Sequence, residues 1–332
     1  MSNLPFKITE SVGQTKLRQL VHAITEAISN GKLKVGDTLP SVNQLSNESG
    51  YSRDTVFKAY NILKQRNIVE SAPTKGYFVA NESYKVFVLL DDFSAFKEQL
   101  YQSFRQNLPD SYSVDLLFHH YNREVFRQLI QNSLGRYSMY VVMNMDHNTI
   151  DPILNKIDPN KLLILDMGRP ENGKMNFLLQ DFNQSVKACL EKGKIHLRKY
   201  LELILVYAEN STPHPFETVF AVRNFCKKNK ISMRIVRNVS ENDIKKGQIY
   251  FVIRDADLVK VIKSCRAKNL ELGKDVGVLS YNDTPMKQIV GGGISVISTD
   301  FELMGKQAAE FVKTKQKIGK ILPTSFILRD SL

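Results

Sequence analysis

A short stretch near the amino terminus, SGYSRDTVFKAY at positions 49–60, combines charged and aromatic residues with an apolar stripe at helical spacing. Arg53 would lie near the start of this helix, and Phe57 would lie opposite the stripe or on its flank. An arginine can bind a guanine edge or a phosphate, and a phenylalanine ring can contact a thymine methyl group. The stretch therefore predicts a helix that reads the major groove of DNA. The alternative is that Phe57 packs on a neighbouring element.

A second group of polar residues follows apolar runs of strand length in the rest of the chain. Carboxylates and amides can bind several hydroxyl groups at once, and aromatic rings can cover a sugar ring. The carboxyl ends of strands are the edge at which open α/β sheets bind ligands, so we expect a sugar or similar polyol there. The alternative for each Asp or Asn is a cap on the following helix. The group comprises Asp91, Asp92, His119, His120, Asn144, Asp166, Asp181, Asn210, Arg254, Asp255, Asn282 and Asp283.

The elements predicted around the first stretch form a winged helix-turn-helix within residues 15–79. A first helix carries apolar residues at helical spacing and stops at Asn30-Gly31. Ser41 has capping-box spacing ahead of a short second helix, and Ser52 caps a third helix after a tight turn. The segment IVESAPTKGYFVA then predicts a hairpin with a basic tip.

The rest of the chain alternates apolar runs such as KVFVLL, KLLILDM and IYFVI with amphipathic helical stretches. Continuously apolar strands in repeated βα units indicate parallel sheets covered by helices. Roughly ten strands exceed a comfortable single sheet, so we expect two linked α/β subdomains. The predicted domains are 1–80, which binds DNA, and 81–332, which binds an effector and dimerises.

Composition narrows the possible partners. The chain has 332 residues and 46 basic against 34 acidic side chains, a net charge of +12 that favours polyanionic partners. Cys189, Cys226 and Cys265 are far apart in the sequence, so we expect reduced, packed thiols. There is no apolar leader and no apolar run of membrane-spanning length, so we expect a cytoplasmic protein.

Motifs for catalysis and cofactor binding are absent from the sequence. It contains no G-x-x-x-x-G-K-[ST], H-E-x-x-H or G-x-S-x-G motif. His119-His120 lacks a third metal ligand at useful spacing, which favours a strand-end loop over a metal site. We therefore expect neither an enzyme nor a cofactor or metal.

The amino-terminal segment resembles the DNA-binding domain of GntR-type bacterial transcription regulators over residues 10–80. The matching features are G-x-L-x-x-G-x-x-L-P-S, S-R-x-T-V, A-Y-x-x-L and the wing glycine before Y-F-V. The resemblance implies that Ser41, Arg53, Thr55 and the wing at Lys75 and Gly76 face DNA.

One position departs from that family. An arginine usually stands two residues after the serine of L-P-S, and here that residue is Asn43. Its usual DNA contact is therefore missing or made differently, and the operator sequence is open. The candidate DNA-binding residues are Ser41, Asn43, Ser52, Arg53, Asp54, Thr55, Phe57, Lys58, Lys75 and Gly76.

Residues 84–330 resemble the effector domain of lactose-repressor-type regulators, which is similar to periplasmic sugar-binding proteins. The clearest part runs from VIRDADLVKVIK to DFELMGKQAAEFV. Position by position, Arg254 stands for the family's pocket asparagine and Asn282 for the first aspartate of F-D-D. Asp181 matches the aspartate that begins the second subdomain, and Phe96 matches the aromatic residue of the first helix.

The exchanges at Arg254 and Asn282 bring positive charge toward this implied pocket. The effector could therefore be an acidic or phosphorylated sugar as well as a neutral one. Phe93 and Phe96 can offer apolar faces to a sugar. The candidate effector-binding residues are Asp92, Phe93, Phe96, Asn144, Asp181, Arg254, Asp255, Asn282 and Thr299.

Together these features predict a ligand-responsive transcriptional regulator, and its architecture resembles the arabinose-repressor type. We expect a homodimeric repressor of carbohydrate-utilisation genes that a sugar or sugar phosphate releases from a palindromic operator. The alternatives within this class are a non-sugar effector or an activator. A DNA-binding enzyme would need a longer second half with a cofactor lysine, and a transport protein would need a signal peptide and no winged helix.

Overall fold

The computed structural model describes residues 4–8, 14–66, 68–80, 84–169, 175–208 and 214–332. The chain divides into two compact units. The first comprises residues 1–92, 105–177 and 308–319, and the second comprises 93–104, 178–307 and 320–332. The predicted boundary between residues 80 and 81 adjoins a stretch outside the described ranges and stays a prediction, as does the placement of Asn210.

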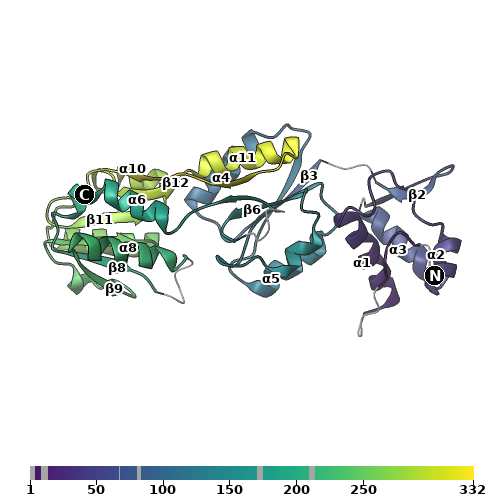
Figure 1. The fold of residues 1–332 in the computed structure, drawn as a ribbon, viewed down its shortest axis with the longest axis horizontal. Coiled ribbons are helices and arrows are strands. Elements are labelled where there is room, and N and C mark those ends of the chain that lie inside the picture. Colours follow the sequence, from purple (N-terminus) through teal and green to yellow (C-terminus); the bar gives the residue numbers. More distant parts are fainter. Residues whose placement is uncertain (1–3, 9–13, 67, 81–83, 170–174, 209–213) are drawn as a thin grey trace. The chain divides into compact units, whose positions relative to one another are not determined.

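Helices α1, α2 and α3 and a hairpin form the amino-terminal part of the first unit (Figure 1). Their bounds are α1 Lys16–Ser29, α2 Val42–Ser49, α3 Arg53–Gln65, β1 Val69–Ala72 and β2 Gly76–Val79. The two strands pair antiparallel, with Ala72 opposite Gly76. The predicted winged helix-turn-helix is confirmed.

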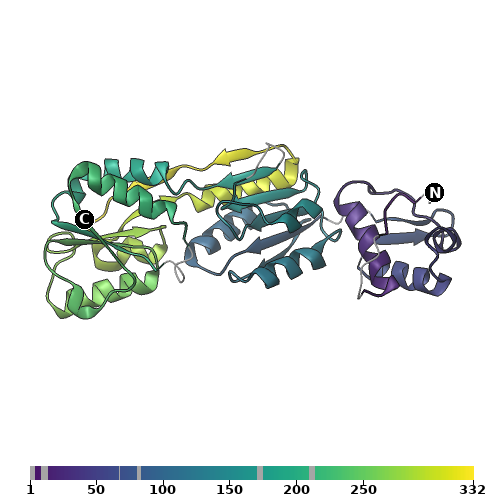
Figure 2. The ribbon, with the colours of Figure 1, turned by 60° about the horizontal axis from the view of Figure 1, so that its bottom comes forward.

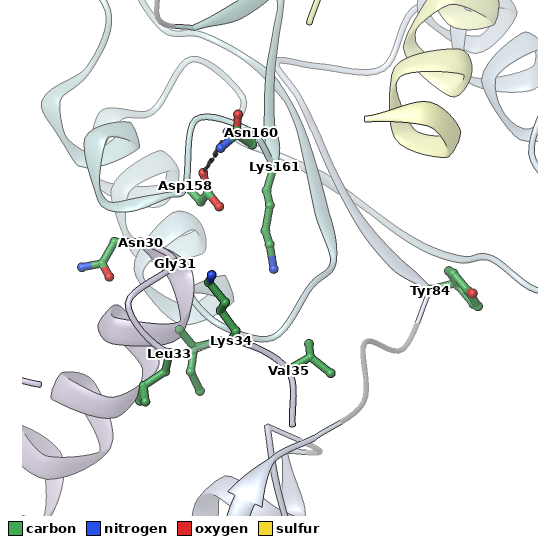
Figure 3. A pocket seen from close by; sticks show the side chains of 10 residues that line it. Asn30, Gly31, Leu33, Lys34, Val35, Tyr84, Asp158, Asn160 and Lys161 are labelled. Carbon is green, nitrogen blue, oxygen red and sulfur yellow. Dashed lines mark hydrogen bonds between the residues drawn. The ribbon is translucent and has the colours of Figure 1, made fainter. Parts of the chain in front are cut away.

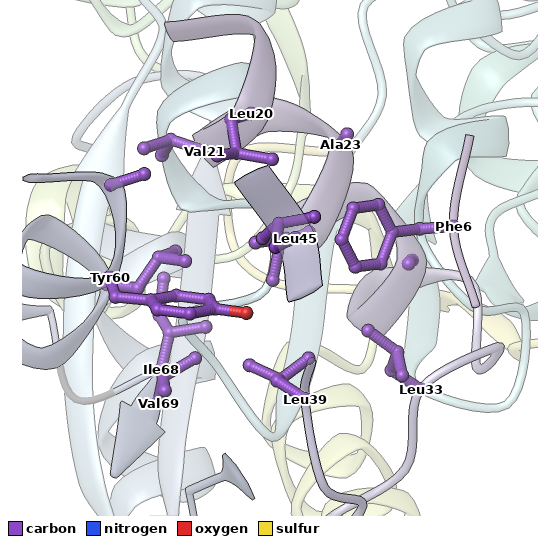
Figure 4. Packing of buried hydrophobic residues seen from close by; sticks show 14 of the residues in the cluster. Phe6, Leu20, Val21, Ala23, Leu33, Leu39, Leu45, Tyr60, Ile68 and Val69 are labelled. Carbon is purple, nitrogen blue, oxygen red and sulfur yellow. The ribbon is translucent and has the colours of Figure 1, made fainter. Parts of the chain in front are cut away.

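One apolar core holds these elements together (Figure 4). Leu20 of α1, Leu45 of α2 and Tyr60 of α3 are fully buried in it. Burying a side chain of this size contributes roughly 1.5–3 kcal/mol. The Tyr60 ring stacks on Tyr77 of the wing at a centroid distance of 4.3 Å, and its hydroxyl donates to the Pro40 carbonyl at 2.6 Å. Tyr60 therefore fixes both the wing and the entry to α2 against α3.

One sheet has the strand order β13-β7-β6-β5-β3-β4 (Figures 1 and 2). It lies in the first unit, except that the last residues of β7 and of β13 are assigned to the second unit. Neighbours from β4 through β3 and β5 to β6 are parallel. The strands β5 and β6 are buried along their whole length, as continuously apolar runs require. The bounds are β3 Lys85–Leu90, β4 Ser113–Phe118, β5 Met139–Met143, β6 Leu162–Asp166, β7 Asn176–Leu179 and β13 Gly319–Ile321.

Asp115 braces the edge of this sheet where β3 and β4 begin. Lys85 Nζ lies 2.8 Å from its carboxylate, and the Tyr137 hydroxyl donates to the same oxygen at 2.7 Å. Burial by itself would raise the pKa of Asp115, but the bonds from Lys85 and Tyr137 outweigh it and hold the pKa below its usual value.

The second unit contains a sheet with the order β14-β12-β11-β10-β8-β9. Its strands from β12 to β9 are parallel, and β14 adds antiparallel to β12. The bounds are β8 Glu202–Val206, β9 Ser232–Val236, β10 Gln248–Val252, β11 Gly277–Tyr281, β12 Ser295–Thr299 and β14 Thr324–Ile327. Two parallel α/β sheets were predicted, and they are confirmed.

Amphipathic helices cover these sheets. Helix α9 buries Leu258, Val261 and Ile262 in one cluster with the strand residues Val252 and Val278, and α8 packs beside α6. The bounds are α4 Ala95–Gln106, α5 Arg123–Ser133, α6 Gln184–Lys192, α7 Lys194–Leu197, α8 Glu217–Asn229, α9 Asp255–Ala267, α10 Pro285–Ile289 and α11 Phe301–Thr314, with 3-10 turns at Pro152–Lys156, Glu241–Asp243 and Val290–Gly292.

Two details differ from or complete the sequence-based expectations. The strands β13 and β14 were not predicted: they are short edge strands, β13 is exposed, and neither alternates clearly. The segment KTKQKIGK contains the end of α11 at Thr314 and the start of β13 at Gly319. The three cysteines are free and buried, as expected, and burial raises the pKa of Cys189 to about 11.

Candidate functional site

The start of helix α3 is set by two hydroxyl side chains. Ser52 accepts a hydrogen bond from the Thr55 backbone N–H at 3.2 Å, and the two hydroxyl oxygens lie 2.8 Å apart. Such a cap satisfies a helix N–H that has no partner within the helix. Gly50, in the left-handed conformation with φ 69°, ends α2 two residues earlier. The tight turn predicted between the two helices is therefore confirmed, and it presents the first turn of α3 at the surface.

The outward face of α3 carries the residues expected to read DNA. Arg53, Asp54 and Lys58 are exposed, and Lys58 Nζ lies 2.8 Å from the Asp54 carboxylate. The Phe57 side chain is 49% exposed. Half of an aromatic ring on an otherwise charged helix face is thus available to a partner. The alternative was that Phe57 packs on a neighbouring element, and such packing can cover at most the half of the side chain that is not exposed.

Helix α2 presents a second exposed pair. Ser41 accepts the Gln44 backbone N–H at 3.2 Å and so caps α2, while the Gln44 side chain donates to Glu48 at 2.9 Å instead of returning to the cap. Only one half of the capping box is therefore formed. Ser41 and Asn43 both remain exposed, which leaves them available to a partner.

The wing ends in an exposed basic tip. Lys75 and Gly76 stand at the turn between β1 and β2, and Gly76 adopts φ 71°, which favours glycine. Lys75 Nζ lies 4.3 Å from the centre of the Phe78 ring, a cation–π contact that holds the ammonium group at the tip. The wing strands and the inner face of α3 both pack in the apolar core described above.

In the second unit, Arg254 and Asp255 lie where β10 passes into α9. Arg254 Nε is 2.8 Å from Oδ2 of Asp257, whose side chain is 2% exposed. Asp255 forms an ion pair with Lys287, whose Nζ lies 2.9 Å from the carboxylate. The charge expected from Arg254 is therefore compensated within the chain, which sequence comparison alone did not indicate.

Asn282 has an unusual backbone and an unusual side chain. Its φ is 58°, a left-handed conformation that only asparagine, aspartate and glycine adopt readily. Its side-chain oxygen Oδ1 is buried and accepts no hydrogen bond from any residue in the described part of the chain. Such residues cluster at ligand sites, because the surrounding structure must hold them in place.

Two cations that the sequence did not single out hold the turn around Asn282. Lys287 donates to the Tyr281 carbonyl at 2.9 Å and to the Asn282 carbonyl at 2.8 Å. Burial lowers the pKa of this lysine, and its Asp255 partner opposes that shift. Arg329 makes two hydrogen bonds to the Asp283 carboxylate, at 2.9 and 2.6 Å.

Three further candidates are engaged in local structure. The Asp181 carboxylate accepts backbone N–H groups of Gln184 and Ser185 at 3.0 and 2.9 Å, and so caps α6. Asn144 donates both amide hydrogens to backbone carbonyls of its own loop, each at 2.6 Å. The Thr299 hydroxyl donates to Gln180 at 2.7 Å. These bonds match the capping alternative for Asp181 and give Asn144 a role in shaping the loop.

The remaining candidates follow strand β3. The Asp92 backbone N–H donates to Asp91 at 2.8 Å, in the first unit. In the second unit, Phe93 is 66% exposed, and Phe96 packs on Phe301 with ring centres 4.7 Å apart. Of the two aromatic residues, Phe93 is therefore the more exposed.

Sequence reasoning also missed an aromatic cluster beside Asn282. His214 contacts the rings of Tyr281 and Phe182 at centroid distances of 4.4 and 5.1 Å. Phe182 and Tyr281 are buried. The only hint in the sequence was Tyr281, which directly precedes Asn282 and Asp283. A single tyrosine at the end of a strand is too common to indicate such a cluster.

A separate hollow of about 700 Å³ lies in the first unit (Figure 3). Lys34, Tyr84 and Lys161 are among its lining residues, and Asn160 donates to the Asp158 carboxylate within it. The lining contains no predicted DNA-binding or effector residue. The hollow therefore belongs to neither predicted site.

Two further observations concern metals and membranes. His, Cys, Asp and Glu side chains nowhere gather in groups of three that could hold a metal ion, within the ranges that the structure describes. His119 instead accepts the Tyr121 backbone N–H through Nδ1 at 3.2 Å, in a strand-end turn. Among the described helices, none is long and apolar enough to cross a membrane.

Comparison with known families agrees with the geometry. The family described as "Bacterial regulatory proteins, gntR family" matches residues 16–79, and "Periplasmic binding protein-like domain" matches residues 213–332. The chain thus joins a winged helix-turn-helix to a binding-protein-like domain. Its amino-terminal domain belongs to the gntR family.

Two curated relatives each match 25% of this chain. The mannosyl-D-glycerate transport/metabolism system repressor MngR of Escherichia coli is 39% identical over 85 residues, which are 25% of this chain and 34% of MngR. The HTH-type transcriptional repressor YtrA of Bacillus subtilis is 32% identical over 84 residues, 25% of this chain and 64% of YtrA. The chain thus spans about a third of MngR and under two thirds of YtrA.

Solved structures resemble about three quarters of the chain in fold. The trehalose repressor from Escherichia coli has a TM-score of 0.61 at 12% identity and covers 74% of this chain and 100% of its own. The periplasmic binding ribose operon repressor protein from Lactobacillus acidophilus has a TM-score of 0.61 at 16% identity and covers 76% of this chain and 99% of its own. At these identities the likeness establishes the fold alone.

Proposed function

We propose that this chain is a sequence-specific DNA-binding transcriptional regulator whose second domain binds a small-molecule effector. The observation that carries the proposal is the capped, exposed face of α3 next to a basic wing, within a domain of the gntR family. A regulator of this kind would act in the cytoplasm. The names of MngR and YtrA as repressors support repression over activation.

In this proposal α3 enters the major groove and the wing lies along the backbone. Arg53 would bind a guanine edge or a phosphate, and Phe57 would contact thymine methyl groups. Lys75 at the tip would bind phosphate, and Gly76 lets the backbone approach it closely. The proposed contacts are Ser41, Asn43, Ser52, Arg53, Asp54, Thr55, Phe57, Lys58, Lys75 and Gly76.

The proposed effector is a sugar or a sugar phosphate that releases the chain from its operator. The support is the binding-protein-like fold, together with Asn282, whose acceptor is buried and unpartnered among the described residues. Two of the solved structures with a similar fold are a trehalose repressor and a ribose operon repressor. Asp92, Phe93, Arg254 and Asp255 would lie near the ligand, while Asn144, Asp181 and Thr299 would hold the surrounding backbone and Phe96 would pack behind it.

A homodimer is proposed to form through α9 and α10. The Lys287–Asp255 ion pair ties α10 to the start of α9. On these two helices Val259, Met286 and Ile289 are 48%, 63% and 71% exposed. Exposed apolar side chains on adjoining elements are typical of subunit interfaces. Two copies would place two reading helices on the half-sites of a palindrome.

The proposal is tested by fluorescence anisotropy with full-length protein and DNA from upstream of its own coding sequence. We expect sequence-selective binding that weakens steeply as salt is raised, because phosphate contacts release bound ions. The DNA-binding part would be refuted if scrambled DNA of equal length displaced the protein as well as the upstream DNA does.

The dimer is tested by sedimentation. Ile289→Asp should shift the protein from dimer to monomer, with Ile321→Asp, at an exposed position on β13, as the control.

A further inference from the structure

A cluster of cations surrounds the end of helix α6 and the short helix α7 in the second unit. An open hollow of about 700 Å³ lies there, and we call its surface the α7 face. Its lining residues are Glu191, Lys192, Lys194, Ile195, Arg198 and Lys199. The α7 face shares no residue with the proposed DNA-binding, effector-binding or dimer surfaces.

Most of the positive charge of the α7 face is not neutralised within the chain. Glu191, the one carboxylate of the lining, already accepts a hydrogen bond from Lys228 at 2.9 Å, and this bond holds the pKa of Glu191 below its usual value. Among the residues that the structure describes, none forms an ion pair with Lys192, Lys194 or Arg198. The face therefore carries surplus positive charge that is open to a partner.

Helix geometry explains only part of this charge. The carboxyl end of a helix attracts cations, and Lys192 lies in the last turn of α6. Helix α7 is a single turn of 4 residues, so its summed peptide dipole is too small to account for Lys194 and Arg198. We therefore look for a partner that these two cations would bind.

An exposed isoleucine lies among these cations. The Ile195 side chain is 78% exposed and lines the same hollow. A single exposed apolar side chain is common on protein surfaces and by itself needs no partner. Inside a basic hollow it gains importance, because the aliphatic stems of lysine and arginine extend the apolar contact around it. The α7 face can therefore bind an apolar group and several negative charges at once.

This combination selects among possible partners. The outer surface of a nucleic acid offers phosphates but no apolar group, so it would leave Ile195 in water. An anionic membrane surface binds helices that present several apolar side chains, and α7 exposes one. A second copy of the α7 face would bring like charges together. A protein segment with carboxylates on both sides of an apolar side chain matches both the charge and the isoleucine.

We propose that the α7 face is a docking site for an acidic segment of another protein, whose apolar side chain packs on Ile195 and whose carboxylates pair with Lys192, Lys194 and Arg198. The contact is small and its ion pairs are exposed, so each pair is weak and the complex is transient. Raising the salt concentration weakens it, because exposed charges are screened. This site goes beyond the proposed function and depends on neither the operator nor the effector.

The first test is fluorescence anisotropy of the full chain with labelled peptides. One probe is a decapeptide of glutamate with leucine at every third position, and the other is decaglutamate. We expect the leucine-containing peptide to bind at least fivefold tighter, because only its side chains can cover Ile195. Equal affinity for the two peptides, or no binding of either at low salt, overturns the proposal.

The second test locates the charge that binds the peptide. Lys192→Glu combined with Arg198→Glu reverses two cations of the α7 face, so we expect the leucine-containing peptide to bind at least tenfold more weakly. The control is Lys317→Glu combined with Lys320→Glu, which changes the net charge equally at two exposed lysines outside the face. It should weaken binding less than about twofold. Equal losses in the two double variants would indicate unspecific attraction and overturn the proposal.

The third test isolates the isoleucine. Ile195→Ser should weaken the leucine-containing peptide about fivefold and leave decaglutamate unchanged. Ile321→Ser is the control, because that side chain is 62% exposed and lies outside the hollow lining. Equal affinities in the two serine variants overturn the proposal.

Operator binding separates this proposal from the proposed function. Lys192→Glu combined with Arg198→Glu should bind the operator as the unmodified chain does. If it binds operator or scrambled duplex DNA more weakly, the α7 face contacts nucleic acid, and the proposal is overturned while the proposed function stands. An unmodified chain that binds the leucine-containing peptide through this face but binds no operator would refute the proposed function alone.

Discussion

Replacing Tyr60 with phenylalanine removes one hydroxyl from the core of the DNA-binding domain. The hydroxyl donates to the buried Pro40 carbonyl at 2.6 Å, and burial keeps it protonated by raising the pKa of Tyr60. The substitution deletes that bond and leaves a buried carbonyl without its donor, which costs about 2 kcal/mol. At about 1.4 kcal/mol per factor of ten, the opening equilibrium of the domain should rise roughly 30-fold.

Hydrogen–deuterium exchange of the α3 backbone amides, followed by mass spectrometry of the full chain, measures this opening directly. Tyr77→Phe is the matched control, because Tyr77 belongs to the same ring stack and its hydroxyl has no hydrogen bond to a described residue. We expect the control to change protection by less than about threefold. Equal loss of protection in both variants would refute the role given to the Tyr60 hydroxyl. Operator affinity should persist in Tyr60→Phe, since the side chain does not face the surface.

Other predictions concern DNA reading, backbone strain and pH. Arg53→Ala should lower operator selectivity by about 1–3 kcal/mol in anisotropy competition, whereas Lys58→Ala should weaken all sequences alike; unchanged selectivity in Arg53→Ala would contradict the reading role. Gly273→Ala should destabilise the second unit by about 3 kcal/mol in thermal unfolding, because φ is 78° and a Cβ would overlap a backbone carbonyl. Gly36→Ala, with φ 84° and open space, should cost only about 1 kcal/mol. Asp115 has a folded-state pKa below its unfolded value of about 3.9, so its stabilisation is present above that pH and is lost as pH falls through the folded pKa. Asp115→Asn should flatten acid unfolding over that range, and an unaltered acid profile would count against this linkage.

Local patterns were sufficient for much of the fold. The helices of the DNA-binding domain were predictable because their apolar stripes and caps, such as Ser52, are encoded within a few residues. The central strands were predictable because burial on both faces demands continuous apolar runs. The strands β13 and β14 lie at sheet edges, where burial demands little of the sequence, and so gave no signal.

The candidate site was less predictable because its decisive contacts join distant residues. Lys287 reaches Asp255 and Arg329 reaches Asp283, pairs that only the folded sheet brings together. The Arg254–Asp257 pair spans a single helical turn, so it was visible in the sequence. Position-by-position comparison with a family drew attention to Arg254, because it replaces the family's asparagine. It drew none to Asp257, which neutralises the arginine.

The Asp54–Lys58 ion pair has a consequence for how the reading helix responds to ionic strength. With Arg53, the exposed first turns of α3 carry two cations and one anion, a net charge of one. Each phosphate neutralised by a protein adds about 0.9 to the slope of log affinity against log salt, through displaced counterions. Lys58 must exchange Asp54 for phosphate, so it contributes less than a free lysine would. Helix α3 should therefore add little to indiscriminate attraction for DNA, and any preference it confers must come from base contacts.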